Sequence, residues 1–255
     1  TTGGLSYPTT GSDGTGYGMA ESFGHTILNT FPALTPLLTN DSDWKSLSGV
    51  SLDAKLSFVR NGKKVCDYRD SFLFTHFGFS GPAALNISRH LASAKREENP
   101  EIRASFLPEE NDESLQAAFQ SAKKTRPEKL VRNLLAEEFS LPARFVETLL
   151  KKIAASEAQP IENFSNENQK RLIRLLLHYP LEAESVFGYK KAEVTAGGVD
   201  LKEIKVATME SKLVSGLYFA GEILDVDGRI GGFNFQWSWS TGAVAGRSAA
   251  RSLLP

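Results

Sequence analysis

Three glycines in one short loop constrain this chain more than any other feature. Gly228, Gly231 and Gly232 lie within YFAGEILDVDGRIGGFNFQWSWSTGAVAG, the stretch from Tyr218 to Gly246. Glycine loses more conformational freedom on folding than other residues, so this concentration predicts positive φ angles or a backbone that closely approaches another group. Composition and spacing by themselves also allow a tight structural turn at this position.

The segments on both sides of this loop have the parts of one side of a dinucleotide site. The apolar run from Gly216 to Gly221 has the length of a strand and is followed by Glu222, and a carboxylate there can accept hydrogen bonds from ribose or ribityl hydroxyls. The segment after Gly232 predicts a helix, whose first N–H groups suit a phosphate or an electron-rich ring edge. We expect this helix to pack through its small residues, Ala243, Ala245, Gly246 and Ala249.

The middle of the chain predicts a separate sheet and a group of helices. Apolar and polar residues alternate from Val50 to Phe58, Asn61-Gly62 is typical of a type I′ hairpin turn, and Glu101 to Leu107 forms a further expected strand. After Pro108 the apolar residues take helical spacing, and Ser165 begins one of the expected helices. The sequence therefore predicts an α/β fold in which the first and last segments form one domain around inserted elements.

Charge and cysteine content exclude several classes of protein. The chain has 29 basic and 30 acidic side chains, a balance that argues against a nucleic-acid binder, although it allows a local basic patch. Cys66 is the single cysteine, which excludes a disulfide framework. The sequence contains no apolar run of membrane-spanning length and no signal peptide at its start, so we expect a cytoplasmic protein with neither a membrane nor a nucleic-acid partner.

His76 is the candidate general acid. It lies in FTHFGFSGP, just before an expected helix in which Ser80 is the N-cap and Pro82 lies in the first turn. An imidazole beside such a loop can donate a proton, but a purely structural histidine also accounts for the pattern. The run from Asp225 to Gly228 lacks the further ligands of an EF-hand loop, so we expect no metal site.

Three blocks of the chain resemble, in order and spacing, the signatures of the BaiN/YhiN-like family of NAD(P)/FAD-dependent oxidoreductases. They are TGGLSYPTTGSDGTGYGMAESFGH, FTHFGFSGPAALNISR, and AEVTAGGVDLKEI with the long block that ends in GGFNFQWSWSTGAVAG. The resemblance covers Thr1 to about Arg247. It implies a two-dinucleotide-binding, Rossmann-like FAD domain interrupted by a β-barrel-like insert, which itself carries a helical insert.

The resemblance also implies boundaries and site residues. We expect FAD-domain segments at 1–42 and 194–255, a β-barrel-like insert at 43–108, a helical insert at 109–178 and return strands at 179–193. By resemblance, a turn against the cofactor contains Thr2, Gly3 and Gly4, with Thr1 where the family usually has Ala. Gly221 and Glu222 match the pair near the ribityl chain and pyrophosphate. The positions beside the isoalloxazine ring are Gly231, Gly232, Phe233, Asn234, Phe235 and Gln236.

Family members begin with a strand and a G-x-G-x-x-G turn that holds the ADP half of FAD, and neither is present in this chain. We therefore expect a partial FAD domain that is inactive by itself. In the intact protein the resemblance implies hydride transfer from NAD(P)H through FAD to a small organic acceptor. Two other interpretations stay open: a flavin-linked RNA-modifying protein and a non-catalytic binding module.

Overall fold

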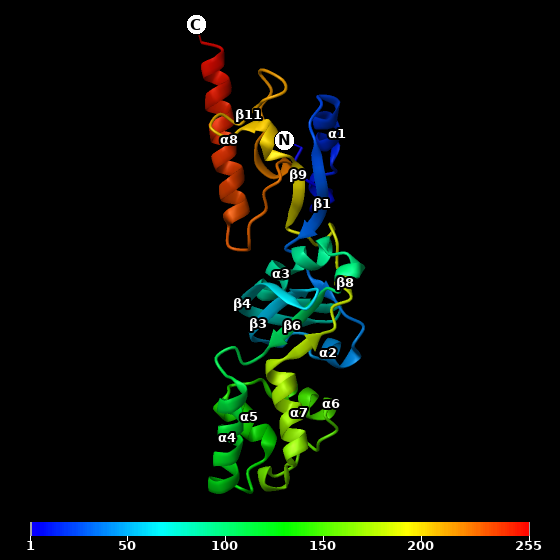
Figure 1. Ribbon diagram of the computed structural model, residues 1–255, viewed down its shortest axis with the longest axis vertical. Helices are drawn as coiled ribbons and strands as arrows, with labels where there is room; N and C mark the ends of the chain where they lie inside the picture. The colour runs from blue at the N-terminus through cyan, green and yellow to red at the C-terminus, as the bar shows by residue number, and fades with distance from the viewer. Residues whose placement is uncertain (1, 255) are drawn as a thin grey trace. The chain divides into compact units, whose positions relative to one another are not determined.

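The computed structural model describes residues 2–254 and divides into two compact units (Figure 1). The glycine-loop unit comprises the residues up to Pro36, residues 88–93 and the chain from Val186 onward. The sheet unit comprises residues 37–87 and 94–185. The overall class is the expected one, mixed α/β. The finer boundaries expected from the sequence stay a prediction.

The glycine-loop unit is built on two short antiparallel ladders and two helices. Its elements are α1 (Thr15–Ser22), β1 (Ile27–Ala33), β9 (Val194–Val199), β10 (Ile204–Lys205), β11 (Glu210–Ser211) and α8 (Phe233–Ser252). β1 pairs with β9, and β10 pairs with β11. In β9 the backbone of Gly197 approaches β1 so closely that an added Cβ would lie 2.2 Å from the carbonyl oxygen of Asn29. Only glycine fits this ladder at that position.

The run from Gly216 to Gly221 is not the strand that the sequence predicted. Tyr218 forms an isolated bridge with Glu210, and a single 3-10 turn occupies Gly221–Ile223. A short apolar run becomes a strand only where a neighbouring edge pairs with it. The backbone at Gly221 is instead held by side chains of α8, as described below.

The expectation for the buried face of α8 is only partly correct. Ala245 is buried and packs in a cluster that includes Val199, Phe219 and Leu224, but Ala243 and Gly246 are exposed. The buried face follows a spacing of four residues, in which Thr241 and Ala245 lie on the same side of the helix. Helical periodicity, rather than small size, therefore decides which residues of α8 are buried.

The sheet unit contains a seven-stranded sheet in the order β7-β6-β3-β4-β5-β2-β8. The strands are β2 (Leu37–Leu38), β3 (Ser51–Arg60), β4 (Lys63–Thr75), β5 (Gly78–Ser80), β6 (Glu101–Ser105), β7 (Tyr179–Leu181) and β8 (Ser185–Val186). β7 and β8 are the two edges, so the sheet is open and not the closed barrel that the expected barrel-like insert suggested. The predicted turn between β3 and β4 is confirmed, because Asn61 and Gly62 have positive φ angles of 51° and 74°.

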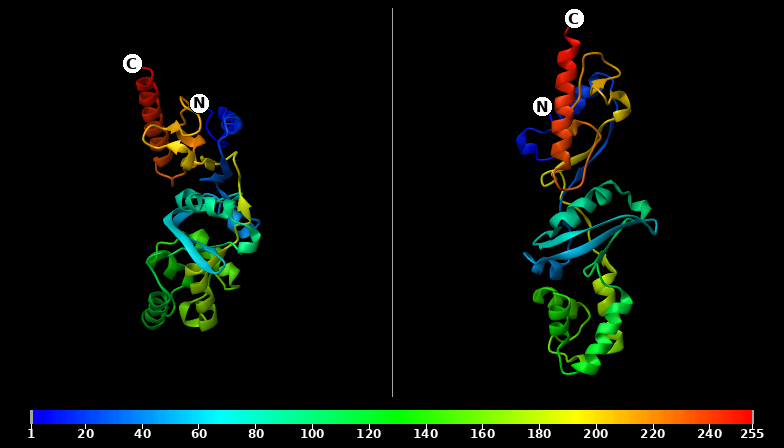
Figure 2. Two further views of the ribbon diagram at one scale, coloured as in Figure 1. Left: turned by 45° about the horizontal axis from the view of Figure 1, so that its top comes forward. Right: turned by 90° about the vertical axis from the view of Figure 1, so that its left-hand side faces the viewer.

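Helices complete the sheet unit. They are α2 (Ser42–Ser46), α4 (Asp112–Thr125), α5 (Val131–Glu138), α6 (Ala143–Lys152) and α7 (Asn166–Leu177), while α3 (Gly81–Ser93) directly follows β5 and contributes its first part. Ser165 caps α7 as predicted, since its hydroxyl accepts a hydrogen bond from the Asn168 amide at 3.1 Å. Figure 2 shows α4, α5 and α7 gathered on one side of the sheet.

Candidate functional site

The turn at the start of the chain lies against β9 and Glu222. The Thr195 hydroxyl accepts hydrogen bonds from the amides of Leu5 and Ser6, at 2.8 and 3.1 Å, while the Glu222 carboxylate accepts one from the Thr195 amide at 3.0 Å. A Cβ added to Gly4 would lie 2.5 Å from the Glu222 carboxylate. The structure therefore brings two of the predicted cofactor-binding segments together, although they lie more than 200 residues apart in the sequence.

The carboxyl group of Glu222 is electrostatically unusual. Burial raises its pKa above the ordinary value of 4.5, because removing water disfavours the charged form. Hydrogen bonds from Thr195 act in the opposite direction without cancelling this effect. The proton on Glu222 is thus held more tightly than that of an exposed glutamate.

The glycine loop has the backbone that its composition predicted. Gly231 and Gly232 have positive φ angles of 124° and 84°, and Gly232 is the N-cap of α8. Gly228 shows the other expected property, close approach, since a Cβ there would lie 2.9 Å from the Cβ of Phe233. The Asn234 side chain fixes the loop by accepting from the Gly228 amide at 2.7 Å and donating to the Gly228 carbonyl at 3.0 Å.

An ion pair between a buried carboxylate and an exposed arginine anchors the same loop at Asp227. The Asp227 carboxylate contacts Arg89 of α3 at 3.1 Å, and only 6% of its side chain is exposed. Burial raises the pKa of Asp227, and the nearby Arg89 opposes that shift. The loop is therefore held at two points, Asp227 and Gly228, before it enters α8.

Two residues of α8 that sequence reasoning missed hold Gly221. The Thr241 hydroxyl accepts a hydrogen bond from the Gly221 amide at 2.9 Å, and the Trp237 indole donates one to the Gly221 carbonyl at 3.2 Å. Gly221 itself has a φ of 77°, which favours glycine. The spacing of four between Trp237 and Thr241 was the available signal, because it places both on one face of a helix.

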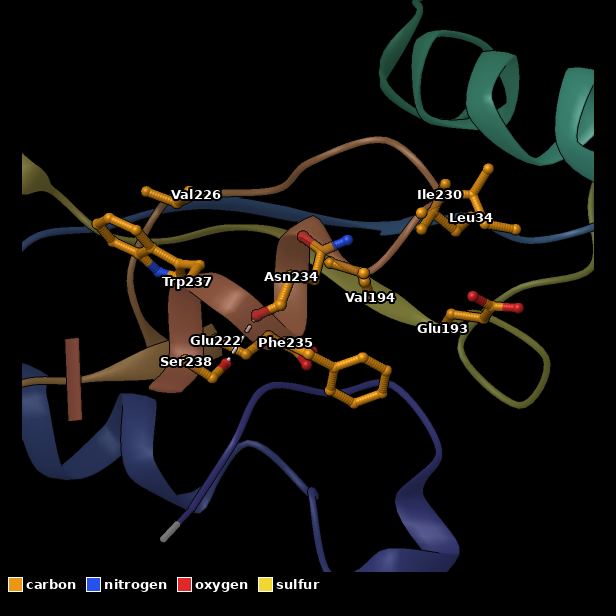
Figure 3. A pocket seen from close by; sticks show the side chains of 12 residues that line it. Leu34, Glu193, Val194, Glu222, Val226, Ile230, Asn234, Phe235, Trp237 and Ser238 are labelled. Atoms are coloured by element: carbon orange, nitrogen blue, oxygen red, sulfur yellow. Dashed lines mark hydrogen bonds between the residues drawn. The ribbon is translucent and has the colours of Figure 1, made fainter. Parts of the chain in front are cut away.

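These segments surround two cavities in the glycine-loop unit. The loop cavity has a volume of about 310 Å³ and is lined at its polar side by Glu222, Asn234 and Ser238 (Figure 3). The turn cavity has a volume of about 710 Å³ and includes Thr2, Gly3 and Gly221. Glu222 and Ser238 line both cavities, so the two adjoin at these side chains.

The predicted site residues divide accordingly. Those that line the loop cavity are Glu222, Gly231, Gly232, Asn234 and Phe235, and those that line the turn cavity are Thr2, Gly3, Gly221 and Glu222. Gly4 lies behind them, in the hydrogen-bonded network with Thr195. Phe233 and Gln236 line neither cavity: the Phe233 ring contacts the Arg229 guanidinium, and the Gln236 amide donates to Ser240. Thr1 lies outside the described residues.

His76 belongs to the sheet unit. It is exposed in the two-residue turn between β4 and β5, and its ring lies 4.9 Å from that of Phe77. Ser80 ends β5, and Pro82 is the second residue of α3, which agrees with the expected helix start. The role of His76 as a proton donor stays a prediction.

The residues around the two cavities fit a flavin nucleotide. Apolar side chains of Val226, Ile230, Phe235 and Trp237 line the loop cavity and suit a flat ring. A Cβ on Gly232 would meet no protein atom within 4 Å, so the backbone of the loop is open on that side. Glu222 lies between the loop cavity and the larger turn cavity. It supplies a hydrogen-bond acceptor where the hydroxyl groups of a flavin's ribityl chain would need one.

Within residues 2–254 no group of three or more His, Cys, Asp and Glu side chains is placed to hold a metal ion. None of the helices in that range is long and apolar enough to cross a membrane.

An α/β unit with a glycine loop and a helix start beside a ring-sized cavity is typical of a Rossmann-like domain. The chain belongs to the HI0933-like family, because the family model for the HI0933-like protein Rossmann domain matches residues 1–248. This confirms the expected family and fold class.

Three curated relatives are similar along nearly the whole chain. The ribosomal RNA dihydrouridine synthase of Haemophilus influenzae is 36% identical over 98% of this chain and 59% of its own length. The 3-dehydro-bile acid delta(4,6)-reductase of Clostridium scindens is 34% identical over 97% of this chain and 60% of its own. The ribosomal RNA dihydrouridine synthase of Escherichia coli is 35% identical over 94% and 57%. The chain thus spans less than two thirds of the length of each of these relatives.

Proposed function

We propose that this chain is part of an FAD-dependent oxidoreductase that saturates a carbon–carbon double bond next to a carbonyl group, with NAD(P)H as the reductant. The names of the relatives support this common chemistry. Dihydrouridine is uridine with one ring double bond reduced, and a delta(4,6)-reductase reduces double bonds of a steroid skeleton. A pyrimidine nucleoside and a steroid differ in shape, so the feature common to the two reactions is the reduction of an activated double bond.

The observation that carries the proposal is the position of Glu222 between two cavities, one ring-sized with an apolar and a polar side and the other lined by the N-terminal turn. Thr2, Gly3, Glu222 and Asn234 would hold the cofactor, with the Gly231-Gly232 backbone beside it. Bound FAD would supply the hydride-transfer chemistry, which no side chain provides.

The residues of the chain contribute positioning and polarity. The start of α8 presents amide N–H groups that have no partner within the helix, and together with the helix dipole they favour negative charge near Gly232. The side chains of Val226 and Trp237 keep water from the apolar part of the loop cavity. The half-buried Glu222 carboxyl accepts hydrogen bonds from hydroxyl groups or, while protonated, donates one.

A small organic compound with a conjugated carbonyl group is the first candidate substrate. A uridine within RNA is the second candidate, because two of the relatives described above are named for ribosomal RNA. Because the net charge of the chain is near zero, its surface as a whole does not attract RNA. An RNA substrate would therefore need a local basic surface.

The test uses the intact protein under anaerobic conditions. We expect a flavin absorption spectrum that bleaches with NADH or NADPH and returns when a conjugated enone or a uridine-containing RNA is added. The saturated ketone that corresponds to the enone is the matched control and should leave the flavin reduced. A purified intact protein without flavin, or one whose reduced flavin is reoxidised by neither acceptor, would contradict the proposal and favour a non-catalytic binding module.

A further inference from the structure

One face of α7 in the sheet unit carries an uncompensated group of positive charges. Lys170, Arg171 and Arg174 are all exposed, and within the described part of the chain none of them forms an ion pair. Four residues of α7 rise about 6 Å along the helix, so Lys170 and Arg174 follow one another along the same side. We call these three residues the α7 basic ridge.

Some other cations of this unit are neutralised by ion pairs, whereas Lys124 and Arg132 form none among the described residues. Arg126 pairs with Glu138, and Lys129 pairs with Glu137 at 2.6 Å. In α6, Lys151 and Lys152 pair with Asp43 and Asp41, at 2.6 and 2.5 Å. The α7 basic ridge differs from these paired cations. Its nearest carboxylate along the helix is Glu167, an exposed side chain one turn earlier, which forms no ion pair with the ridge among the described residues.

A polar cavity lies at the end of α7, next to the ridge. It has a volume of about 350 Å³, and Leu177 and His178 form part of its wall. Its floor is the face of β3 and β6 that carries Lys55 and Arg103, which belong to cross-strand pairs two positions apart. Arg103 is held by a bidentate pair with Glu101, both contacts being 2.9 Å, and His178 contacts Asp112 at 2.7 Å.

This cavity is polar and carries charges of both signs. Glu110 and Asp112 stand at one side, near the start of α4. Lys55 is part of the floor and has no ion pair within residues 2–254. Hydroxyl groups of Ser57 and Ser105 line the floor as well, and both can donate or accept hydrogen bonds. The cavity therefore offers donors and acceptors for a polar ring or sugar, while the ridge offers positive charge.

We propose that the α7 basic ridge, with the adjoining cavity, binds the phosphate backbone of an RNA strand. This inference rests on the second candidate of the proposed function, an RNA substrate. Exposed cations without ion partners on one helix face are the arrangement that neutralises consecutive phosphates and releases their counterions. A chain with a net charge of −1 gains little from long-range attraction, so contacts with RNA must be concentrated on such a local surface.

The test measures binding of a labelled ribosomal RNA fragment, transcribed in vitro, to the intact protein at salt concentrations between about 50 and 200 mM. The variant K170Q/R171Q/R174Q removes the ridge charges, and K63Q/K95Q/R96Q removes three other exposed cations of the sheet unit. The three ridge side chains are exposed and form no ion pair among the described residues, so we expect the ridge variant to fold. Circular dichroism checks that both variants are folded. Reduction of the flavin by NAD(P)H in the absence of RNA is recorded in the unmodified protein as a separate measurement.

We expect the slope of log affinity against log salt concentration to decrease in magnitude by about 2 in the ridge variant. Each phosphate contact contributes roughly 0.7–0.9 to this slope, and the variant removes three cations. The control variant should keep the slope of the unmodified protein. Equal slopes and affinities in the unmodified protein and the ridge variant would overturn the inference. If the flavin is not reduced by either nicotinamide, the proposed function fails instead, whatever the RNA measurement shows.

Discussion

The sheet unit and the glycine-loop unit are stabilised by different kinds of interaction. In the sheet unit the fully buried Trp44 contacts the rings of Phe74, Phe106, Phe145 and Tyr179, with ring centres 5.3 to 6.1 Å apart. In the glycine-loop unit the recurring interactions are hydrogen bonds to backbone groups of glycines, as at Gly221 and Gly228.

The difference shows which property each unit preserves. Aromatic packing gives the sheet unit a dense core that tolerates little change in volume. Backbone hydrogen bonds at glycines instead leave room beside the chain, and they fix the outline of the loop and turn cavities without filling them. Mutations should therefore reduce folding in one unit and cofactor binding in the other.

Trp44→Ala should give the largest effect. Deleting a fully buried aromatic ring costs about 3–5 kcal/mol in the free energy of unfolding, and the indole bond to the Tyr179 hydroxyl at 2.9 Å is lost as well. Denaturant unfolding followed by circular dichroism measures this loss. Trp44→Phe, which keeps a ring but not the donor, should cost less. We expect flavin content per folded protein to be unchanged, and a parallel loss of flavin would contradict the separation of the two units.

Gly232→Val tests the glycine-loop unit with a smaller effect on folding. A β-branched residue at a φ of 84° is strained by about 1–2 kcal/mol, although the structure shows no protein atom within 4 Å of the new Cβ. Gly188→Val is the matched control, because Gly188 has a φ of 92°, equally open surroundings and no place in either cavity. Flavin content after gel filtration should fall for Gly232→Val only. Equal flavin content in the two variants would show that the loop does not hold the cofactor.

Glu222→Gln should change how stability depends on pH. The pKa of Glu222 is higher in the folded state than its ordinary value of 4.5. The contribution of Glu222 to folding stability is therefore fully present below pH 4.5 and is lost as pH rises through the folded-state pKa. Glutamine stays neutral and can still accept from the Thr195 amide. The melting temperature of Glu222→Gln relative to the unmodified protein should therefore increase from pH 4 to pH 7. Glu21→Gln, an exposed change on α1, controls for the lost charge, and the same trend in both variants would sink the assignment.

His76→Ala should have the smallest effect on stability, within about 0.5 kcal/mol, because the side chain is exposed in a turn. If His76 donates a proton to the substrate, the oxidative half-reaction slows by roughly 10²–10⁴, while reduction of the flavin stays near normal. Stopped-flow traces of the two half-reactions measure both steps. An unchanged oxidative half-reaction in a folded variant would show that His76 is a surface residue without a catalytic role.

Local sequence determined the features that depend on neighbouring residues. The turn at Asn61-Gly62, the cap at Ser165 and the positive φ angles of Gly231 and Gly232 all follow from backbone preferences within a few positions. The alternation from Val50 to Phe58 likewise specified a strand with one buried face, since side chains in a strand alternate between faces. The long C-terminal block was distinctive enough to indicate the family from its residues alone.

Tertiary structure decided what depends on partners distant in the sequence. The run from Gly216 to Gly221 had a strand pattern, but it forms only the single bridge between Tyr218 and Glu210, and Thr241 and Trp237 hold its end at Gly221. Which face of α8 is buried, and that Phe233 and Gln236 line neither cavity, depend on how the helix is rotated against its neighbours. The physical reason is that a hydrogen bond or a buried contact between remote segments requires both partners in place, and no local preference specifies the second one.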